Sequence, residues 1–281
     1  MTNLAELTRM IYSGRGVHVG MTPKGEPFLA YHLTGRSPPS QKREFQQGEK
    51  TGVIRTAITD REQLERGSSA LLVYPAIIPV QSVASDGVQK KLIGFVASNG
   101  VQTELIYSRL MRNSSLGNVS RADDVIAHSV LQGIFTEAFH DPDFRYDPEH
   151  DRLIDITDYE PDENSTSRVN AILLGSSAYM HSVHKEEGSM RRVINHFPIC
   201  LRSGVIRSLS TYAGGNEKPL KPFTSNPLEG EIKITSLTPK DIAEELYAAI
   251  GPKGDDNYRV GVVVVMKDVQ PAIINRSQRG A

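Results

Sequence analysis

Apolar and polar residues alternate in two short runs near the start of the chain. Val and His alternate over residues 17–19, and the same pattern returns over 28–33, after a Thr-Pro-Lys-Gly sequence at 22–25. A period of two residues is typical of β-strands, and Pro and Gly between two such runs indicate a turn. The pattern therefore predicts a β-hairpin at the start of the chain.

Further apolar runs predict a protein rich in strands. Residues 69–83 are almost continuously apolar and are interpreted as a buried strand pair or one long bent strand. Other strands are expected over 53–58, 92–98, 169–174, 178–184, 191–201, 205–212, 258–266 and 271–275. Helical spacing of apolar residues predicts helices over 2–11, 103–112, from Ser120 to about 140, and after Thr238. The acidic segment 141–155 is expected to be a surface loop.

This order of elements predicts an α+β fold. Most strands follow one another as hairpins, and the few helices are inserted without a regular βαβ alternation. Two packed, mainly antiparallel sheets flanked by helices would bury both the apolar strands and the helix stripes. Residues 1–281 contain no break in composition, so we expect one domain.

The composition indicates which kinds of binding partner and which cellular compartment fit this protein. The 281 residues carry 32 basic and 33 acidic side chains, and this balance argues against a nucleic-acid partner. A single cysteine, Cys200, excludes an intrachain disulfide and fits a reducing cytoplasm. The first residues are too polar for a signal peptide, and no apolar run reaches membrane length. A homo-oligomer stays open, because the sequence does not report oligomeric state.

Basic and hydroxyl side chains gather around the predicted hairpin. Arg15 lies at the start of the first strand, and Arg36 and Ser37 follow the second, with Arg43 or Lys42 a few residues later. The ends of an antiparallel pair bring Arg15 and Arg36 to the same edge. Guanidinium and hydroxyl groups bind phosphate oxygens, so a phosphate site is predicted; the alternative is an ordinary surface turn. Pro38 and Pro39 are expected to keep this loop non-helical.

Other residues are candidates for a catalytic role, and each of them also has a purely structural interpretation. Glu160 would serve as a base if an apolar wall or other acids raised its pKa; otherwise it belongs to a solvated acidic loop. Tyr74 interrupts an apolar run and is more typical of a core residue than of a catalytic one. Asn99, before Gly100, could donate to a carbonyl or could simply occupy a turn with positive φ. Thr2 would become a terminal nucleophile after removal of Met1, although a polar segment separates it from the first strand.

Five segments in order resemble a known family. GRGVHVG and GEPFLAYHLTGRSPPSQKR open the series, and FVASNGVQTELI, DYEPDENSTSRVNAILL and STYAGGNE follow. Together they resemble the archaeal-type IMP cyclohydrolases in motif order and rough spacing. The resemblance implies a four-layer αββα fold similar to that of N-terminal-nucleophile hydrolases, without the terminal nucleophile. It also implies the closure of 5-formamidoimidazole-4-carboxamide ribotide (FAICAR) to inosine monophosphate, with loss of water.

The resemblance also implies roles for individual residues. Arg15, Arg36 and Ser37 would anchor the purine ribotide, with Arg43 as a weaker member. Tyr74 would donate a proton to the formyl oxygen or orient it, and Glu160 would act as the base. The carboxamide pocket would be shaped by Asn99 and Gly100, with Arg168 beside Glu160, and no metal or organic cofactor would be required. Two alternatives stay open: an amide hydrolase using Thr2, and a purine-nucleotide-binding protein without catalysis.

Overall fold

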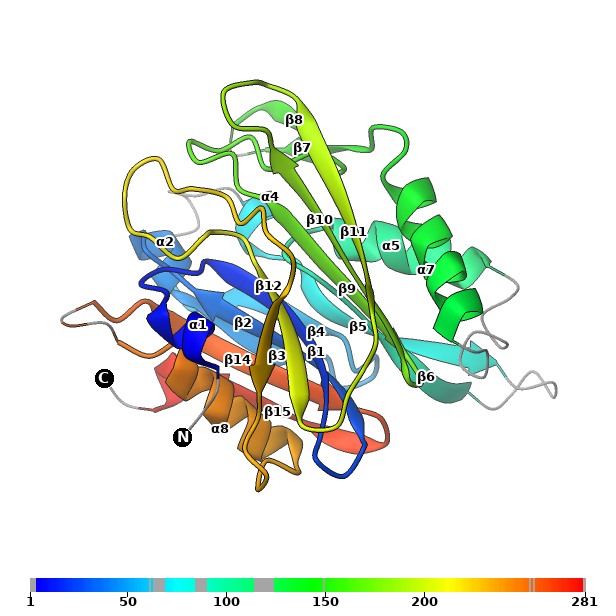
Figure 1. Cartoon of the computed structure of the whole chain (residues 1–281). Helices are drawn as coiled ribbons and strands as arrows, with labels where there is room; N and C mark the ends of the chain where they lie inside the picture. The colour runs from blue at the N-terminus through cyan, green and yellow to red at the C-terminus, as the bar shows by residue number, and fades with distance from the viewer. Residues whose placement is uncertain are drawn as a thin grey trace.

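Two large β-sheets face each other, and helices cover their outer faces (Figure 1). The computed structural model describes residues 4–60, 62, 69–83, 90–113, 124–148, 150–252, 254 and 256–279. Thr2 and Ser120, the expected nucleophile and helix cap, lie outside these residues. The predicted α+β class is confirmed.

The first sheet has six strands in the order β13-β12-β1-β2-β14-β15, and all its neighbours are antiparallel. Its strands are β1 (Arg15–Met21), β2 (Pro27–Thr34), β12 (Val205–Ser210), β13 (Leu228–Glu231), β14 (Arg259–Met266) and β15 (Val269–Asn275). The hairpin predicted from the opening alternation is β1 and β2, with Arg15 opposite Leu33. This register places the start of β1 and the end of β2 at the same edge of the sheet.

The second sheet has seven antiparallel strands in the order β11-β10-β9-β6-β5-β4-β3. They are β3 (Arg43–Gln47), β4 (Ile54–Ile58), β5 (Pro75–Val83), β6 (Lys90–Ser98), β9 (Arg168–Leu174), β10 (Ser177–Lys185) and β11 (Arg192–Ile199). A separate ribbon pairs β7 (Phe144–Asp147) with β8 (Arg152–Asp155).

Three apolar clusters make this arrangement a four-layer sandwich. The largest fills the space between the sheets and includes Val17, Tyr31 and Val263. The second packs α5 and α7 on the outer face of the seven-stranded sheet, and the third packs α1 and α8 on the six-stranded sheet. The helices are α1 (Ala5–Arg9), α2 (Pro38–Gln41), α4 (Ser69–Leu72), α5 (Gln102–Arg112), α7 (Asp124–Ala138), α8 (Pro239–Ala249) and the 3-10 turn η1 (Arg276–Gln278). Similarity to N-terminal-nucleophile hydrolases stays a prediction.

Local sequence signals explain where α8 begins. The Thr238 hydroxyl accepts from the Asp241 backbone N–H, and the Asp241 carboxylate accepts from the Thr238 backbone N–H. This reciprocal capping box satisfies two donors that the helix itself leaves free and is worth about 1 kcal/mol. Pro239 occupies the first helical position, where its missing N–H costs nothing. No helix in the described part of the chain is long and apolar enough to span a membrane.

Four local predictions are wrong, each for a physical reason. Residues 69–83 begin with the helical turn α4 before strand β5, so they are not strand throughout. The expected loop 141–155 contains the β7–β8 ribbon, whose strands of four residues each are too short for their alternation to stand out in the sequence. Pro38 and Pro39 open the helical turn α2, because proline fits the first positions of a helix. β3 was not expected either, since Phe45 is the only apolar residue in this edge strand.

Candidate functional site

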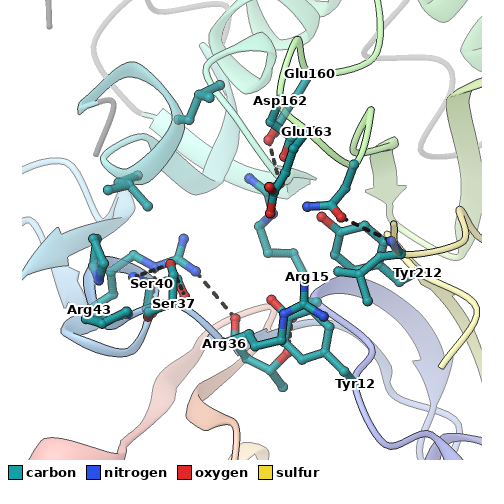
Figure 2. Close-up of a pocket in the computed structure, with 18 of the residues that line it drawn as sticks. Tyr12, Arg15, Arg36, Ser37, Ser40, Arg43, Glu160, Asp162, Glu163 and Tyr212 are labelled. Carbon is teal, nitrogen blue, oxygen red and sulfur yellow. Dashed lines mark hydrogen bonds and ion pairs between the residues drawn. The ribbon is translucent and has the colours of Figure 1, made fainter. Parts of the chain in front are cut away.

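A cavity of about 620 Å³ opens at the end of the sandwich where β1 starts and β2 ends. Its walls come from five separate segments (Figure 2). They are Tyr12, Gly14 and Arg15; Thr34, Arg36, Ser37, Pro38, Pro39, Ser40 and Arg43; Leu71 and Leu72; Glu160, Asp162, Glu163 and Asn164; and Tyr212, Lys218 and Leu220. Segments far apart in the sequence therefore meet at one polar cavity.

A buried ionic cluster forms the inner part of this site. Glu160 accepts from Arg15 Nη2 at 2.6 Å through Oε2 and from Arg168 Nη1 at 2.9 Å through Oε1. The Glu160 and Arg168 side chains are 2% and 1% exposed, and that of Arg15 is 10% exposed. Arg15 also donates to the Asn99 carbonyl oxygen at 3.0 Å, and Arg168 donates to the Asp158 carbonyl oxygen at 3.0 Å.

The two arginines of the cluster differ in electrostatic surroundings. Burial alone would lower the pKa of Arg15, but the charge and hydrogen bond of Glu160, together with Tyr74 and Tyr31, raise the net pKa well above the usual value. Burial dominates at Arg168 and lowers its pKa, with the charge of Arg15 adding to the same direction. Both guanidiniums stay protonated, because arginine is not deprotonated in proteins. With Glu160 ionised, the cluster carries one excess positive charge beside the cavity.

Tyr74 lies behind this cluster and does not line the cavity. Its side chain is fully buried, and its hydroxyl is 2.9 Å from the hydroxyl of Tyr31, which is also fully buried. Burial raises the pKa of Tyr31 well above the usual value, Tyr74 adds to that rise, and the nearby Arg15 opposes it. Tyr31 is a member of this group that the sequence did not single out.

Asn99 and Gly100 also lie behind the cavity. The Asn99 amide donates to the Ser167 carbonyl at 2.8 Å and accepts from the Val169 N–H and from Gln102 Nε2. The side chain therefore holds the backbone around Arg168. A Cβ on Gly100 would lie 2.7 Å from Arg168 Nη1, so a larger residue there would displace the Glu160 partner.

The opposite side of the cavity is basic and hydroxylated. In Figure 2, Ser37, Ser40 and Arg43 lie across the space from Glu160, Asp162 and Glu163. Arg43 donates to the Ser40 carbonyl at 3.0 Å and to the Thr34 carbonyl at 3.4 Å, which fixes it under α2. Lys42 is exposed and is not among the lining residues, so Arg43 is the one of the two that reaches the cavity.

The structure therefore divides the predicted site residues into two groups. Five line the cavity: Arg15, Arg36, Ser37, Arg43 and Glu160. The other four, Tyr74, Asn99, Gly100 and Arg168, lie behind it. Sequence reasoning missed Tyr12, Tyr212 and Lys218 as lining residues, although Tyr12 directly precedes the Ser-Gly-Arg start of β1. Among the described residues, no three His, Cys, Asp or Glu side chains gather as a metal site requires.

The fold and the cavity define an α+β sandwich protein with an arginine-lined cavity built from loops at one end. A family model described as "IMP cyclohydrolase-like protein" matches residues 12–128, which include three of the five lining segments. Over these residues the chain is similar to that family.

Curated relatives point the same way. The IMP cyclohydrolase of Methanococcus maripaludis strain C7 is 24% identical over 206 residues, covering 73% of this chain and 77% of the relative. That of Methanococcus aeolicus is 23% identical over 204 residues, covering 72% and 74%. That of Methanococcus maripaludis strain C6 is 25% identical over 183 residues, covering 65% and 68%. All three alignments are longer than the family match, so the similarity extends beyond residues 12–128.

Proposed function

We propose that this protein is an IMP cyclohydrolase, which closes the formamido and carboxamide arms of FAICAR into the purine ring of inosine monophosphate. One observation supports this most directly: Glu160, held between two guanidiniums, faces a basic, hydroxylated wall across one cavity in a chain that is similar to this family. A ribotide has the matching polarity, with an anionic phosphate at one end and a polar ring at the other.

The basic wall is the proposed phosphate anchor. Arg36, Ser37, Ser40 and Arg43 lie within eight residues along the chain, and all four line the cavity. Guanidiniums and hydroxyls donate to phosphate oxygens, and such charge-assisted hydrogen bonds are about twice as strong as neutral ones. With the phosphate there, the imidazole ring would extend toward Arg15 and Glu160.

Ring closure requires one new bond and the loss of one water molecule. The carboxamide nitrogen attacks the formyl carbon and forms the new C–N bond, while Glu160 accepts the proton that the nitrogen loses. The formyl oxygen receives two protons, the one that Glu160 took from the carboxamide nitrogen and one that the formamido nitrogen loses. Its bond to carbon then breaks, so that it leaves as water while a C=N double bond forms to the formamido nitrogen. Because both reacting groups are attached to one ring, holding that ring in place supplies much of the rate enhancement. Arg15 would donate to the oxygen on which charge develops.

Tyr74 remains the candidate proton donor, with Tyr31 as its partner. One hydroxyl of this pair donates to the other, so the pair holds one further O–H beyond the bond it makes internally. Arg15 separates this pair from the cavity, so the tyrosines would reach a substrate only after a shift of Arg15.

The decisive experiment is incubation of the purified protein with FAICAR while inosine monophosphate formation is followed. Arg36→Ala should raise KM about 10- to 100-fold, as expected for the loss of hydrogen bonds to a charged group, with kcat within a few-fold. Arg202→Ala is the matched control, because this exposed arginine pairs with Glu229 and does not line the cavity. Binding of inosine monophosphate without turnover would instead indicate a nucleotide-binding protein.

A further inference from the structure

A stack of aromatic rings borders the basic side of the cavity. Tyr12 and Tyr212 line it, with ring centroids 5.5 Å apart and planes 27° from parallel. Tyr258 meets the Tyr12 ring edge-on at 5.3 Å, and Leu220 completes the cluster. Tyr12 is therefore held by rings on more than one side.

Arg36 lies against this stack. Its Cζ atom is 5.6 Å from the centroid of the Tyr12 ring, within the range of a cation–π contact. Its hydrogen bonds within the described residues go to the carbonyl and side-chain oxygens of Asn216, both at 3.4 Å, which is long for an N–H donor. Within the described residues, Arg36 has no carboxylate partner, unlike Arg15 and Arg168. Its guanidinium keeps N–H donors for an anion while it lies against the ring of Tyr12.

The stack also reaches the segment that carries Glu160. The Tyr212 hydroxyl contacts Thr166 Oγ1, and Thr166 in turn donates to Asp162 Oδ2 at 2.5 Å. Because the single Thr166 hydrogen goes to Asp162, the Tyr212 hydroxyl is the donor to Thr166. The Asn164 side chain accepts from the Leu220 N–H at 3.0 Å and ties the same two loops together. Arg36 and Glu160 are thus fixed relative to one another through Tyr12 and Tyr212.

We propose that Tyr12 is a positioning residue: its ring, braced by Tyr212, holds the guanidinium of Arg36 where it meets the substrate's phosphate. The inference rests on the proposed function in one respect, namely that Arg36 binds the phosphate. It adds a residue to which neither the sequence nor the family match gave a role. The part that matters is the ring face, so the hydroxyl of Tyr12 is dispensable.

A double-mutant cycle tests this mechanism. Calorimetry measures the affinity for inorganic phosphate and ribose 5-phosphate in the wild type, Tyr12→Phe, Tyr12→Leu, Arg36→Ala and Tyr12→Leu/Arg36→Ala. We expect Tyr12→Phe to stay within about twofold and Tyr12→Leu to weaken binding about three- to tenfold. The double variant should bind no more weakly than Arg36→Ala, because Tyr12 acts through Arg36.

Two results would overturn the proposal. The first is an equal loss from Tyr12→Leu with and without Arg36, which would make Tyr12 an independent contributor. The second is an equal loss from Tyr12→Phe and Tyr12→Leu, which would transfer the role to the hydroxyl. Tyr12→Met is measured as a second replacement, in case leucine disrupts folding.

Tyr247 supplies a matched control. It carries the guanidiniums of Arg259 and Arg279 over its ring at 4.6 and 5.0 Å, and none of the three lines the cavity. Tyr247→Leu should leave phosphate affinity within twofold; a loss equal to that of Tyr12→Leu would show a general effect and reject the positioning role.

Kinetics separates this inference from the proposed function. In Tyr12→Leu, KM for FAICAR should rise by the same factor as the loss of phosphate affinity, with kcat within twofold. A wild-type protein that binds phosphate but forms no inosine monophosphate would refute the proposed function, and the binding cycle would still test Tyr12. A wild-type protein that binds neither phosphate nor ribose 5-phosphate would overturn the inference itself.

Discussion

Two buried polar clusters lie on opposite faces of strand β1, and they differ in almost every property. Arg15 shares a face with Val17 and Val19 and forms the ionic cluster with Glu160 and Arg168. His18 lies on the other face, with Nε2 2.8 Å from Nδ1 of His32. The first cluster is charged and borders the cavity. The second lies under the helical layer, and both of its imidazoles are fully buried.

The histidine pair is a closed network. His18 Nδ1 is 2.7 Å from the Ser208 hydroxyl, and His32 Nε2 is 2.9 Å from the Ser13 hydroxyl. Every ring nitrogen therefore has a partner. Burial lowers the pKa of both histidines, that of His32 to about 3, so both rings are neutral at pH 7. A neutral and fully satisfied network is what a buried structural element requires.

The ionic cluster around Glu160, unlike the histidine pair, has an unpaired hydrogen-bond donor and an unbalanced charge. Arg168 Nη2 has no hydrogen-bond partner in the described part of the chain, and the cluster holds two cations for one anion. Burial of excess charge is costly, and replacing it with apolar residues is often neutral or stabilising. A cluster of buried polar side chains therefore does not by itself indicate a functional site. Net charge, an open side and unfilled hydrogen bonds distinguish the cluster around Glu160.

The largest expected effect comes from removing the charge of Glu160. Glu160→Gln preserves shape but replaces one acceptor oxygen with a donor that faces a guanidinium. We expect kcat for FAICAR closure to fall about 10²- to 10⁴-fold, the usual contribution of a positioned acid or base, with a smaller change in KM. Steady-state kinetics on the folded variant measures both.

Glu104→Gln serves as the control for Glu160→Gln. Glu104 is an exposed partner of Arg55 away from the cavity, so its kcat should equal that of the wild type. Unchanged turnover in Glu160→Gln would reject Glu160 as the base and would leave the ionic cluster, like the histidine pair, with a structural role.

Sequence reasoning located most of the architecture because the core elements carry clear periodicity. The β1–β2 hairpin and the cap of α8 were predictable from alternating residues and from Thr238-Pro239-Lys240-Asp241. β13 and the β7–β8 ribbon were not, because short strands with few buried residues carry no period-two signal. The apolar run 69–83 was misjudged at α4, because periodicity cannot distinguish a short buried helix from a strand.

The site was predictable only where its chemistry is local. The basic loop after β2 could be recognised because Arg36, Ser37 and Arg43 are neighbours in the sequence. Tyr31 and Tyr12 could not, because their importance depends on Tyr74, Tyr212 and Arg36, which reach them only through the fold. No sequence pattern indicated that Asn99 holds the backbone around Arg168 and lies behind the cavity.

Acid should affect the histidine network in a defined direction. A folded-state pKa of about 3 for His32, below an unfolded value near 6.5, means that the unfolded chain binds more protons between these values. Stability is therefore full above pH 6.5 and is lost as the pH falls. His32 alone should lower the free energy of unfolding by about 3 kcal/mol between pH 7 and pH 4.

Urea unfolding at several pH values measures this effect. As the pH falls, the free energy of unfolding should decrease less in His32→Gln than in the wild type, even though the variant is less stable at pH 7. His181 and other buried histidines also have lowered pKa values, so the difference between the two proteins isolates His32. His140→Gln, at a side chain that is 74% exposed, should keep the wild-type slope. A wild-type slope in His32→Gln would contradict the neutral, closed description of this network.

The smallest effect is also the most discriminating, because it acts on the histidine network alone. Ser208→Ala removes the hydroxyl at the end of the network formed by β12 and leaves His18 Nδ1 without its partner. The cost should be about 1–2 kcal/mol of unfolding free energy, the usual penalty for one unpaired buried group. FAICAR turnover should stay unchanged below the unfolding temperature, because Ser208 and His18 do not line the cavity. Unfolding curves and kinetics on the same preparation test both statements.

A fall in kcat while the protein remains folded would mean that the histidine network acts on the site through Ser13 and Gly14. The two clusters on opposite faces of β1 would then not be independent of each other.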